Sequence, residues 1–419
     1  MLKIMQRLFL LAGLISPLFC SAQYNFFKGY VVTNARDTLK GQVFGREGNN
    51  NPSSVRYKSS PSAETQVFSI DDCAAFGVDG KEFYERHKVK ISLSRISFQN
   101  VPNQRDTTFK ENNVFLKVLQ KGKHVNLFAY TDAIKTRFYV STHEDPQPVE
   151  LRYDVFYHPQ IANQVMAEAR YRNQLVALFR QYGISERHDS KLERAEYATS
   201  DMLKIVSLIN GQTQEKPKNP ITRFFVGGGI MLSNAKYQGR HALASKNAVS
   251  KSSPSPYFSA GIDFFVDPAF GKTIIRMELS AFSTENSIAA FTEDSRHFHH
   301  QLKRQSLGIT LMLLRNLYNG LNHKIFIGAG FAMHLVNIKD NTMTYSYLPP
   351  VYTEYIYSEK GPDPEEFQIS LPLTIGATIY KRFEISGAYT IPGNVSSYPG
   401  YRIKQDRYRF GLSYLINKR

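Results

Sequence analysis

Charged side chains recur on the polar face of alternating segments in the second half of the sequence. They lie in mid-segment, between apolar neighbours, and carry both signs of charge. Acids and bases that share a desolvated interior must pair, because an unpaired buried ion costs on the order of several kcal/mol. We therefore predict a structural network of ion pairs among Asp263, Arg276, Glu278, Glu384 and Arg409.

His297, His299 and His300 form the one histidine cluster of the sequence. In an extended chain His297 and His299 share a face, where they can hold a metal with Asp294 as a third ligand. The alternative is a polar loop that enters a strand, which we prefer because no second cluster of ligands accompanies the histidines. We predict no metal site and no cofactor.

The motifs of common enzymes are missing from the sequence. It contains no zinc-protease helix motif, no phosphate-binding glycine loop and no nucleophile elbow. Gly328-Ala329-Gly330 lacks a following glycine and lies within an alternating segment, where glycines ease packing or curvature. We therefore predict no catalytic residues and no cofactor-binding residues, and a protein that is not an enzyme.

The first residues have the three parts of a secretory signal. A basic start, an apolar stretch over residues 8–19 and small residues at Cys20-Ser21-Ala22 predict cleavage before Gln23. The apolar stretch is too short for a comfortable membrane anchor, and the bulky Phe19 disfavours a lipoprotein anchor at Cys20. We expect residues 1–22 to be removed on export.

The chain is strongly basic, with a formal net charge of +16 from 52 basic and 36 acidic residues. This charge suits phosphate-rich partners, either nucleic acid or the anionic headgroups of an outer membrane. Export excludes nucleic acid, so outer-membrane lipid and lipopolysaccharide are the predicted partners. Residues 234–255 contain four basic side chains and no acid, and either contact lipopolysaccharide phosphates or are simply solvated. The four are Lys236, Arg240, Lys246 and Lys251.

Tyrosines are concentrated in residues 337–366. Tyrosine provides a large contact area at low entropic cost, so this segment is either a protein or glycan contact surface or an extension of strands with an aromatic rim. The residues concerned are Tyr345, Tyr347, Tyr352, Glu354, Tyr355, Tyr357 and Glu359.

The front of the mature chain is predicted to form short strands and then two helices. Hairpins are expected over residues 30–43 and 114–129, with a polar loop at residues 45–62. Apolar residues then recur at helical spacing over residues 175–182 and 202–209. We expect these amphipathic helices to dock on the β domain rather than bind a partner.

Two kinds of residue mark the ends of these helices. Gly183 and Gly211 can end them, and Ser200 is the predicted N-cap of the second.

After residue 220 the apolar period becomes two and stays so over eight segments. Short connections alternate with long ones, as in bacterial outer-membrane barrels with periplasmic turns and surface loops. An apolar wall that faces lipid requires a sheet closed on itself, and side chains fill the interior of an eight-stranded barrel. The long loops are predicted at residues 234–255, 285–297, 337–366 and 391–402.

The predicted fold is an all-β transmembrane barrel of eight antiparallel strands, preceded by a small β-rich domain and two amphipathic helices. The predicted divisions are a signal peptide at 1–22, a β-rich periplasmic domain at 23–157, a helical segment at 158–211, a linker at 212–220 and the outer-membrane barrel at 221–419.

The last strand, with Tyr408, Phe410 and Tyr414, is similar to the terminal strand that the barrel assembly machinery recognises, although the chain ends in Asn417-Lys418-Arg419. The C-terminal part resembles the PorT-like, or outer membrane protein β-barrel, families of Bacteroidota. The segment from Gly29 to Gly41 resembles an N-terminal module of exported proteins in that group. The resemblance implies an outer-membrane location and a barrel fold.

Three functions agree with these observations. The favoured one is a non-enzymatic envelope protein that anchors a periplasmic module and displays surface loops for binding. The second is an outer-membrane assembly or secretion factor, as the PorT-like resemblance implies. The third is a barrel enzyme that acts at the membrane, which would need a nucleophile and a base that converge on the barrel wall or rim.

Overall fold

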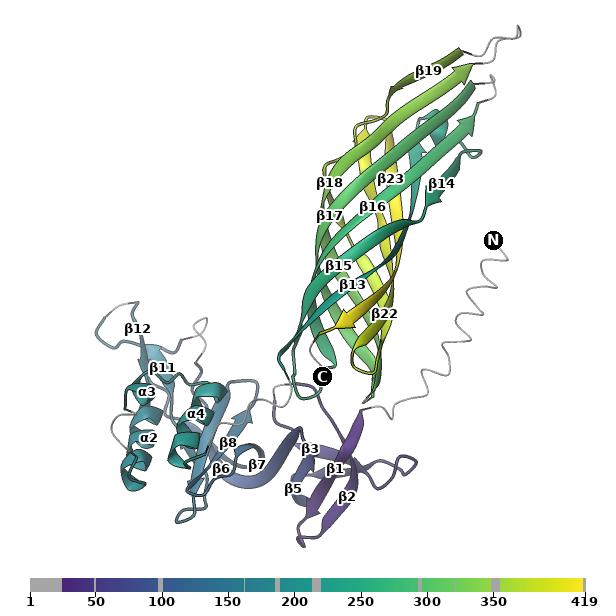
Figure 1. The fold of residues 1–419 in the computed structure, drawn as a ribbon. Helices are drawn as coiled ribbons and strands as arrows, with labels where there is room; N and C mark the ends of the chain where they lie inside the picture. The colour runs from purple at the N-terminus through teal and green to yellow at the C-terminus, as the bar shows by residue number, and fades with distance from the viewer. Residues whose placement is uncertain are drawn as a thin grey trace. The chain divides into compact units, whose positions relative to one another are not determined.

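The computed structural model describes residues 25–48, 50–96, 101–161, 163–184, 189–212, 220–292, 296–320, 322–347 and 355–416. The predicted signal peptide, 1–22, and residues 213–219 of the predicted linker lie outside this part. The chain divides into two compact units, Met1–Lys218 and Asn219–Arg419. In Figure 1 the first runs from purple to teal and the second from teal to yellow.

The first unit contains a ten-stranded antiparallel sheet in the order β10-β9-β8-β7-β6-β5-β1-β2-β3-β4. Both predicted hairpins are confirmed, since β1 pairs with β2 and β7 with β8. The predicted loop at residues 45–62 is wrong in part, because it contains β3, which buries Val55 and Tyr57. The strands are β1 Phe26–Thr33, β2 Thr38–Phe44, β3 Ser54–Lys58, β4 Gln66–Ser69, β5 Cys73–Val78, β6 Glu82–Ser92, β7 Phe109–Gln120, β8 Val125–Thr131, β9 Thr136–Thr142 and β10 Val149–Leu151.

Three helices follow this sheet: α2 Arg170–Gln181, α3 Asp189–Glu193 and α4 Thr199–Ile209. Gly183 and Gly211 take positive φ angles after α2 and α4, as predicted for the ends of these helices. Ser200 is not the N-cap of α4. That position belongs to Ala198, and no side chain caps the helix. A short hairpin of β11 Asp154–Tyr157 and β12 Val165–Glu168 precedes the helices. β11 ends the predicted β-rich domain, whereas β12 lies within the segment predicted to be helical.

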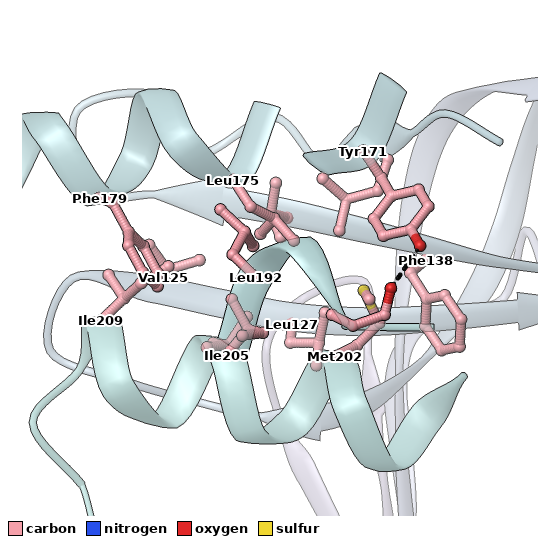
Figure 2. Close-up of a cluster of buried hydrophobic side chains, with 14 of the residues drawn as sticks. Val125, Leu127, Phe138, Tyr171, Leu175, Phe179, Leu192, Met202, Ile205 and Ile209 are labelled. Carbon is pink, nitrogen blue, oxygen red and sulfur yellow. Dashed lines mark hydrogen bonds between the residues drawn. The ribbon is translucent and has the colours of Figure 1, made fainter. Parts of the chain in front are cut away.

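The apolar faces of α2 and α4 pack on β8, β9 and β10. Figure 2 shows Leu175 and Phe179 from α2 and Ile205 from α4 around Val125 and Leu127 of β8. The predicted docking of the amphipathic helices is therefore confirmed.

The second unit is a ring of eight antiparallel strands (Figure 1), in which β16 pairs with β17 to close the sheet. β20 and β21 both pair with β18 and together count as one strand of the ring. The ring consists of β13 Thr222–Gly239, β15 Ser255–Phe265, β16 Thr273–Phe291, β17 Arg296–Asn319, β18 His323–Tyr347, β20 Phe367–Ser370 with β21 Pro372–Ile379, β22 Phe383–Tyr398 and β23 Tyr401–Leu415.

An apolar belt covers the outside of this ring. Leu311 and Phe410 are more than half exposed there, whereas the inward Asp263 is fully buried. The belt ends at one level on neighbouring strands. Outward Leu307 pairs with Leu335, and two residues higher Gln305 pairs with Asn337.

Above the belt the alternation is reversed, with polar side chains outward and apolar side chains inward. This upper core includes Tyr237, Ile288, Leu302, Met343 and Ile403. The four predicted long loops are therefore wrong in large part, because the strands continue through them. β16 and β17 stay paired as far as Phe291 and His297, and β22 and β23 as far as Tyr398 and Tyr401. Short β14 Val249–Ser253 and β19 Tyr355–Lys360 pair with β16 and β18.

Candidate functional site

The lower interior of the barrel contains a buried network of charges. Arg276 on β16 lies between two carboxylates, with Nε 2.7 Å from Asp263 Oδ1 and Nη1 2.6 Å from Glu384 Oε1. Arg223 on β13 donates to the other oxygen of Asp263, at 2.6 Å. These four side chains are at most 4% exposed. These side chains point inward because successive side chains of a strand alternate between its two faces. Closure of the ring places β16 and β22 on opposite sides of the interior.

A second pair lies at the next level, where Arg409 on β23 contacts Glu278 on β16. The Arg409 guanidinium also lies 4.9 Å from the ring centroid of Tyr257. Gly411 leaves room for this tyrosine, because a Cβ at that position would lie 2.2 Å from the Tyr257 hydroxyl. The predicted charge pairing is confirmed.

The upper interior continues with hydrogen bonds between polar side chains. Asn286 accepts from Ser233 Oγ at 3.0 Å and from Gln405 Nε2 at 2.7 Å. Gln405 in turn accepts from Arg304. Arg304 and Arg407 were not included in the predicted network of ion pairs. Both are buried at inward positions of alternating strands, and this alternation is the sequence signal that identifies them.

The three histidines lie on β17 and face different neighbours. His300 is buried, with Nδ1 2.9 Å from the Tyr237 hydroxyl and Nε2 2.9 Å from Asn341 Oδ1. His299 Nε2 lies 2.7 Å from Ser287 Oγ, and His297 stacks on Phe291.

Asp294, the third ligand considered for a metal, lies outside the described residues. Within the described residues, no three His, Cys, Asp or Glu side chains are placed to hold a metal ion.

The basic and aromatic residues considered for surface contacts lie on strands and turns above the belt. Lys236 on β13 faces outward directly opposite Lys404 on β23. Arg240, Lys246 and Lys251 are exposed or partly exposed on the connection and β14 that follow.

Among the tyrosines, Tyr345 on β18 and Tyr357 on β19 are stacked, with ring centroids 5.3 Å apart. Tyr347 and Tyr355 end these strands, and Glu359 lies on β19. Tyr352 and Glu354 fall outside the described residues.

The first unit contains a nucleophile and a base side by side, which the sequence analysis did not find. Lys135 Nζ donates to Ser94 Oγ at 2.8 Å, and Ser94 donates to Asp154 Oδ1 at 2.8 Å. A catalytic dyad needs the opposite polarity, with the hydroxyl proton passing to the base. Both side chains are also buried, so we interpret this group as part of the polar core.

The closed ring of eight antiparallel strands, with an apolar outer belt and a packed charged interior, defines an outer-membrane β-barrel. Within the described residues, no helix is long and apolar enough to cross a membrane.

No protein-family model and no curated protein matches the sequence. Solved structures of outer-membrane proteins do match. Ail from Yersinia pestis has 12% identity and a TM-score of 0.24, over 47% of this chain and 100% of Ail. OprG from Pseudomonas aeruginosa and the protease OmpT from Escherichia coli each have 10% identity, over 48% of this chain and 98% of theirs, with TM-scores of 0.27 and 0.25.

Proposed function

We propose that this chain is a non-enzymatic outer-membrane protein that anchors its first unit in the periplasm and presents strand extensions for binding at the cell surface. The observation that carries the proposal is the length of the strands. A tilted strand crosses a bilayer with about 9–11 residues, whereas β17 has 24 residues and β18 has 25. The upper part of these strands therefore supports a structure outside the lipid.

The connections between strands support this orientation. The connections after β15, β17 and β21 are short, and the start of β13 and the end of β23 lie at the same end of the ring. Short turns face the periplasm in bacterial outer-membrane barrels. The first unit, which precedes β13, is then periplasmic, and the strand extensions face the outside.

The outward lysines immediately above the belt favour lipopolysaccharide as a lipid partner. Lys236 and Lys404 are directly opposite in the β13–β23 ladder, a placement that is destabilising for like charges. A phosphate between them removes the repulsion. The lysine pair lies four residue pairs above outward Leu232 and Tyr408, which is near the level where headgroups meet the apolar belt.

The aromatic rim favours a protein or glycan partner at the surface. Ile356 and Tyr357 on β19 are more than half exposed, and the stacked Tyr345 and Tyr357 form a flat surface. Rigid aromatic side chains bind with little loss of conformational entropy. We further propose that the barrel assembly machinery recognises β23, whose outward aromatic residues include Tyr408 and Phe410.

A second candidate is an assembly or secretion factor of the PorT-like type. The ten-stranded sheet of the first unit is open, with β4 and β10 at its edges. Exposed Val67 and Val149 lie on these two strands. An open edge can accept a strand from a partner protein. Partners that copurify through the first unit would favour this candidate, and partners that bind through the strand extensions would favour the first.

The proposal is tested by localisation and surface labelling. The protein should fractionate with the outer membrane and migrate differently on a gel when heated. A tag inserted at Ser358 on β19 should be labelled on intact cells, and one at Lys216, in the predicted linker, should be labelled only after lysis. Recovery in the soluble periplasm, or the reverse labelling pattern, would contradict the proposal.

A further inference from the structure

Two arginines in the upper interior of the barrel lack a carboxylate partner. Arg304 on β17 and Arg407 on β23 are 2% and 6% exposed, and neither belongs to an ion pair among the described residues. The Nε and Nη1 atoms of Arg304 have no hydrogen-bond partner. Arg407 Nη2 lies 3.2 Å from His334 Nε2, so it donates to a ring nitrogen and not to an acid.

These two guanidinium groups reach adjacent levels of the same interior. Arg304 donates across the barrel to Gln405, and Gln405 and Arg407 are alternate residues of β23 that point to the same side. Two like charges thus lie close together where water is largely excluded, which makes their repulsion stronger than in bulk water.

The lower network cannot neutralise them. Its three arginines, Arg223, Arg276 and Arg409, pair with three acids, Asp263, Glu278 and Glu384. Arg304 and Arg407 are therefore a surplus of positive charge in a buried position. Leaving such a charge unpaired is strongly unfavourable, and a mobile anion can supply the missing partner.

We propose that the upper interior binds a halide-sized anion, with chloride as the physiological candidate, in contact with Arg407. A cavity of about 30 Å³ lies beside this arginine and is also lined by His334, Ser370 and Thr390. A single water-sized particle needs roughly 10–15 Å³, so a monatomic anion fits. Hydroxyl and guanidinium donors supply its ligands, and Arg304 adds positive charge from the level above.

Size separates this ligand from oxyanions. Phosphate and sulfate carry four oxygens around a central atom and exceed the cavity, so they would have to displace the packed side chains around it. The site is also distinct from the outward lysines above the belt, because Arg304 and Arg407 point into the barrel. Its ligand is therefore a small inorganic ion and not a lipid headgroup.

The first test measures the thermal unfolding midpoint of the full chain in detergent, with sodium chloride exchanged for sodium gluconate at constant ionic strength. An ion that binds only the folded state raises the midpoint with the logarithm of its concentration, by about 3–6 °C for each tenfold increase above its Kd. Wild type should show this rise in chloride. Arg407→Met should lose it, and Arg402→Met, an exposed arginine of the same strand, should keep it.

Equal midpoints for wild type in chloride and gluconate would overturn the proposal, as would an unchanged rise in Arg407→Met. If Arg407→Met does not fold, a measurement on wild type alone decides. Crystals of the full chain equilibrated with bromide should show an anomalous peak within contact distance of the Arg407 guanidinium. Anomalous peaks confined to the outer surface, or a cavity that holds water only, would refute the site.

Discussion

At the scale of single residues, the arginines of the barrel interior differ in whether they form an ion pair with a carboxylate. Arg276 binds Asp263 and Glu384 at once, so its removal leaves two buried carboxylates with reduced compensation. The bridging position makes this side chain more important to stability than any one exposed charge, because exposed charges are solvated whether paired or not.

Replacement of Arg276 by Ala should therefore destabilise the barrel, by about 3–5 kcal/mol, the range for breaking a buried ion pair. Lys246→Ala, in an exposed position between β13 and β14, is the control and should change stability little. Unfolding of both variants by denaturant in detergent or lipid measures the difference. Equal stability of the two variants would show that the interior charges are not a stabilising network.

In the first unit, Lys135 is a buried basic side chain. Burial lowers the pKa of this lysine from its ordinary value of 10.5 to about 8. Between pH 8 and 10.5 the unfolded chain holds a proton that the folded chain has released, so the free energy of unfolding rises with pH across this window. Below pH 8 the lysine is protonated in both states and contributes no slope.

The first unit should accordingly become more stable between pH 8 and 10, relative to a Lys135→Met variant measured at the same pH. Hydrogen exchange of peptides that cover β9 in the full chain reports this, because comparison at equal pH cancels the intrinsic exchange rate. Lys204→Met, at an exposed position of α4, is the matched control and should follow wild type. Parallel pH profiles for wild type and Lys135→Met would contradict the prediction.

At the scale of elements, the barrel strands have two segments of opposite polarity. In the belt, outward side chains such as Leu311 are apolar and face lipid. Above it, inward side chains such as Leu302 are apolar and form a second core. Each strand thus passes from lipid into water. This change of environment at the membrane surface accounts for the switch of apolar side chains from the outward to the inward face.

At the scale of the whole barrel, the packed interior argues against a pore. Eight strands enclose a space that side chains fill, and Arg223, Arg276 and Glu384 occupy it at the level of the belt. Ions that cross would have to displace these buried pairs, at a large energetic cost.

Wild-type protein in a planar bilayer should therefore show no large steady conductance. The double variant Arg276→Ala/Glu384→Ala removes two facing side chains of opposite charge, and should raise the conductance by opening space without adding net charge. A large steady conductance of the wild type would show that the interior is not closed.

The sequence by itself determined the features that depend on local periodicity. Alternation of apolar and polar residues predicted eight strands, their facing and the inward position of Arg276 and Glu384, and helical spacing predicted α2 and α4. It did not reveal β3 or the N-cap at Ala198. Of the strands above the belt it allowed only those in residues 337–366, where strand extension was one of two alternatives. In those strands the outward residues are polar, as in a loop, and turn residues such as Gly400 interrupt the pattern.

Only the tertiary structure decided which side chains meet. Closure of the ring joins β16 to β22 across the interior, and so brings Arg276 to Glu384, 108 residues apart in the chain. The same closure leaves Arg304 and Arg407 together without an acid. Pairing across a barrel depends on strand stagger and tilt, which are set by the whole sheet and not by any one segment. The residues could thus be assigned to a face from the sequence, but their partners could not.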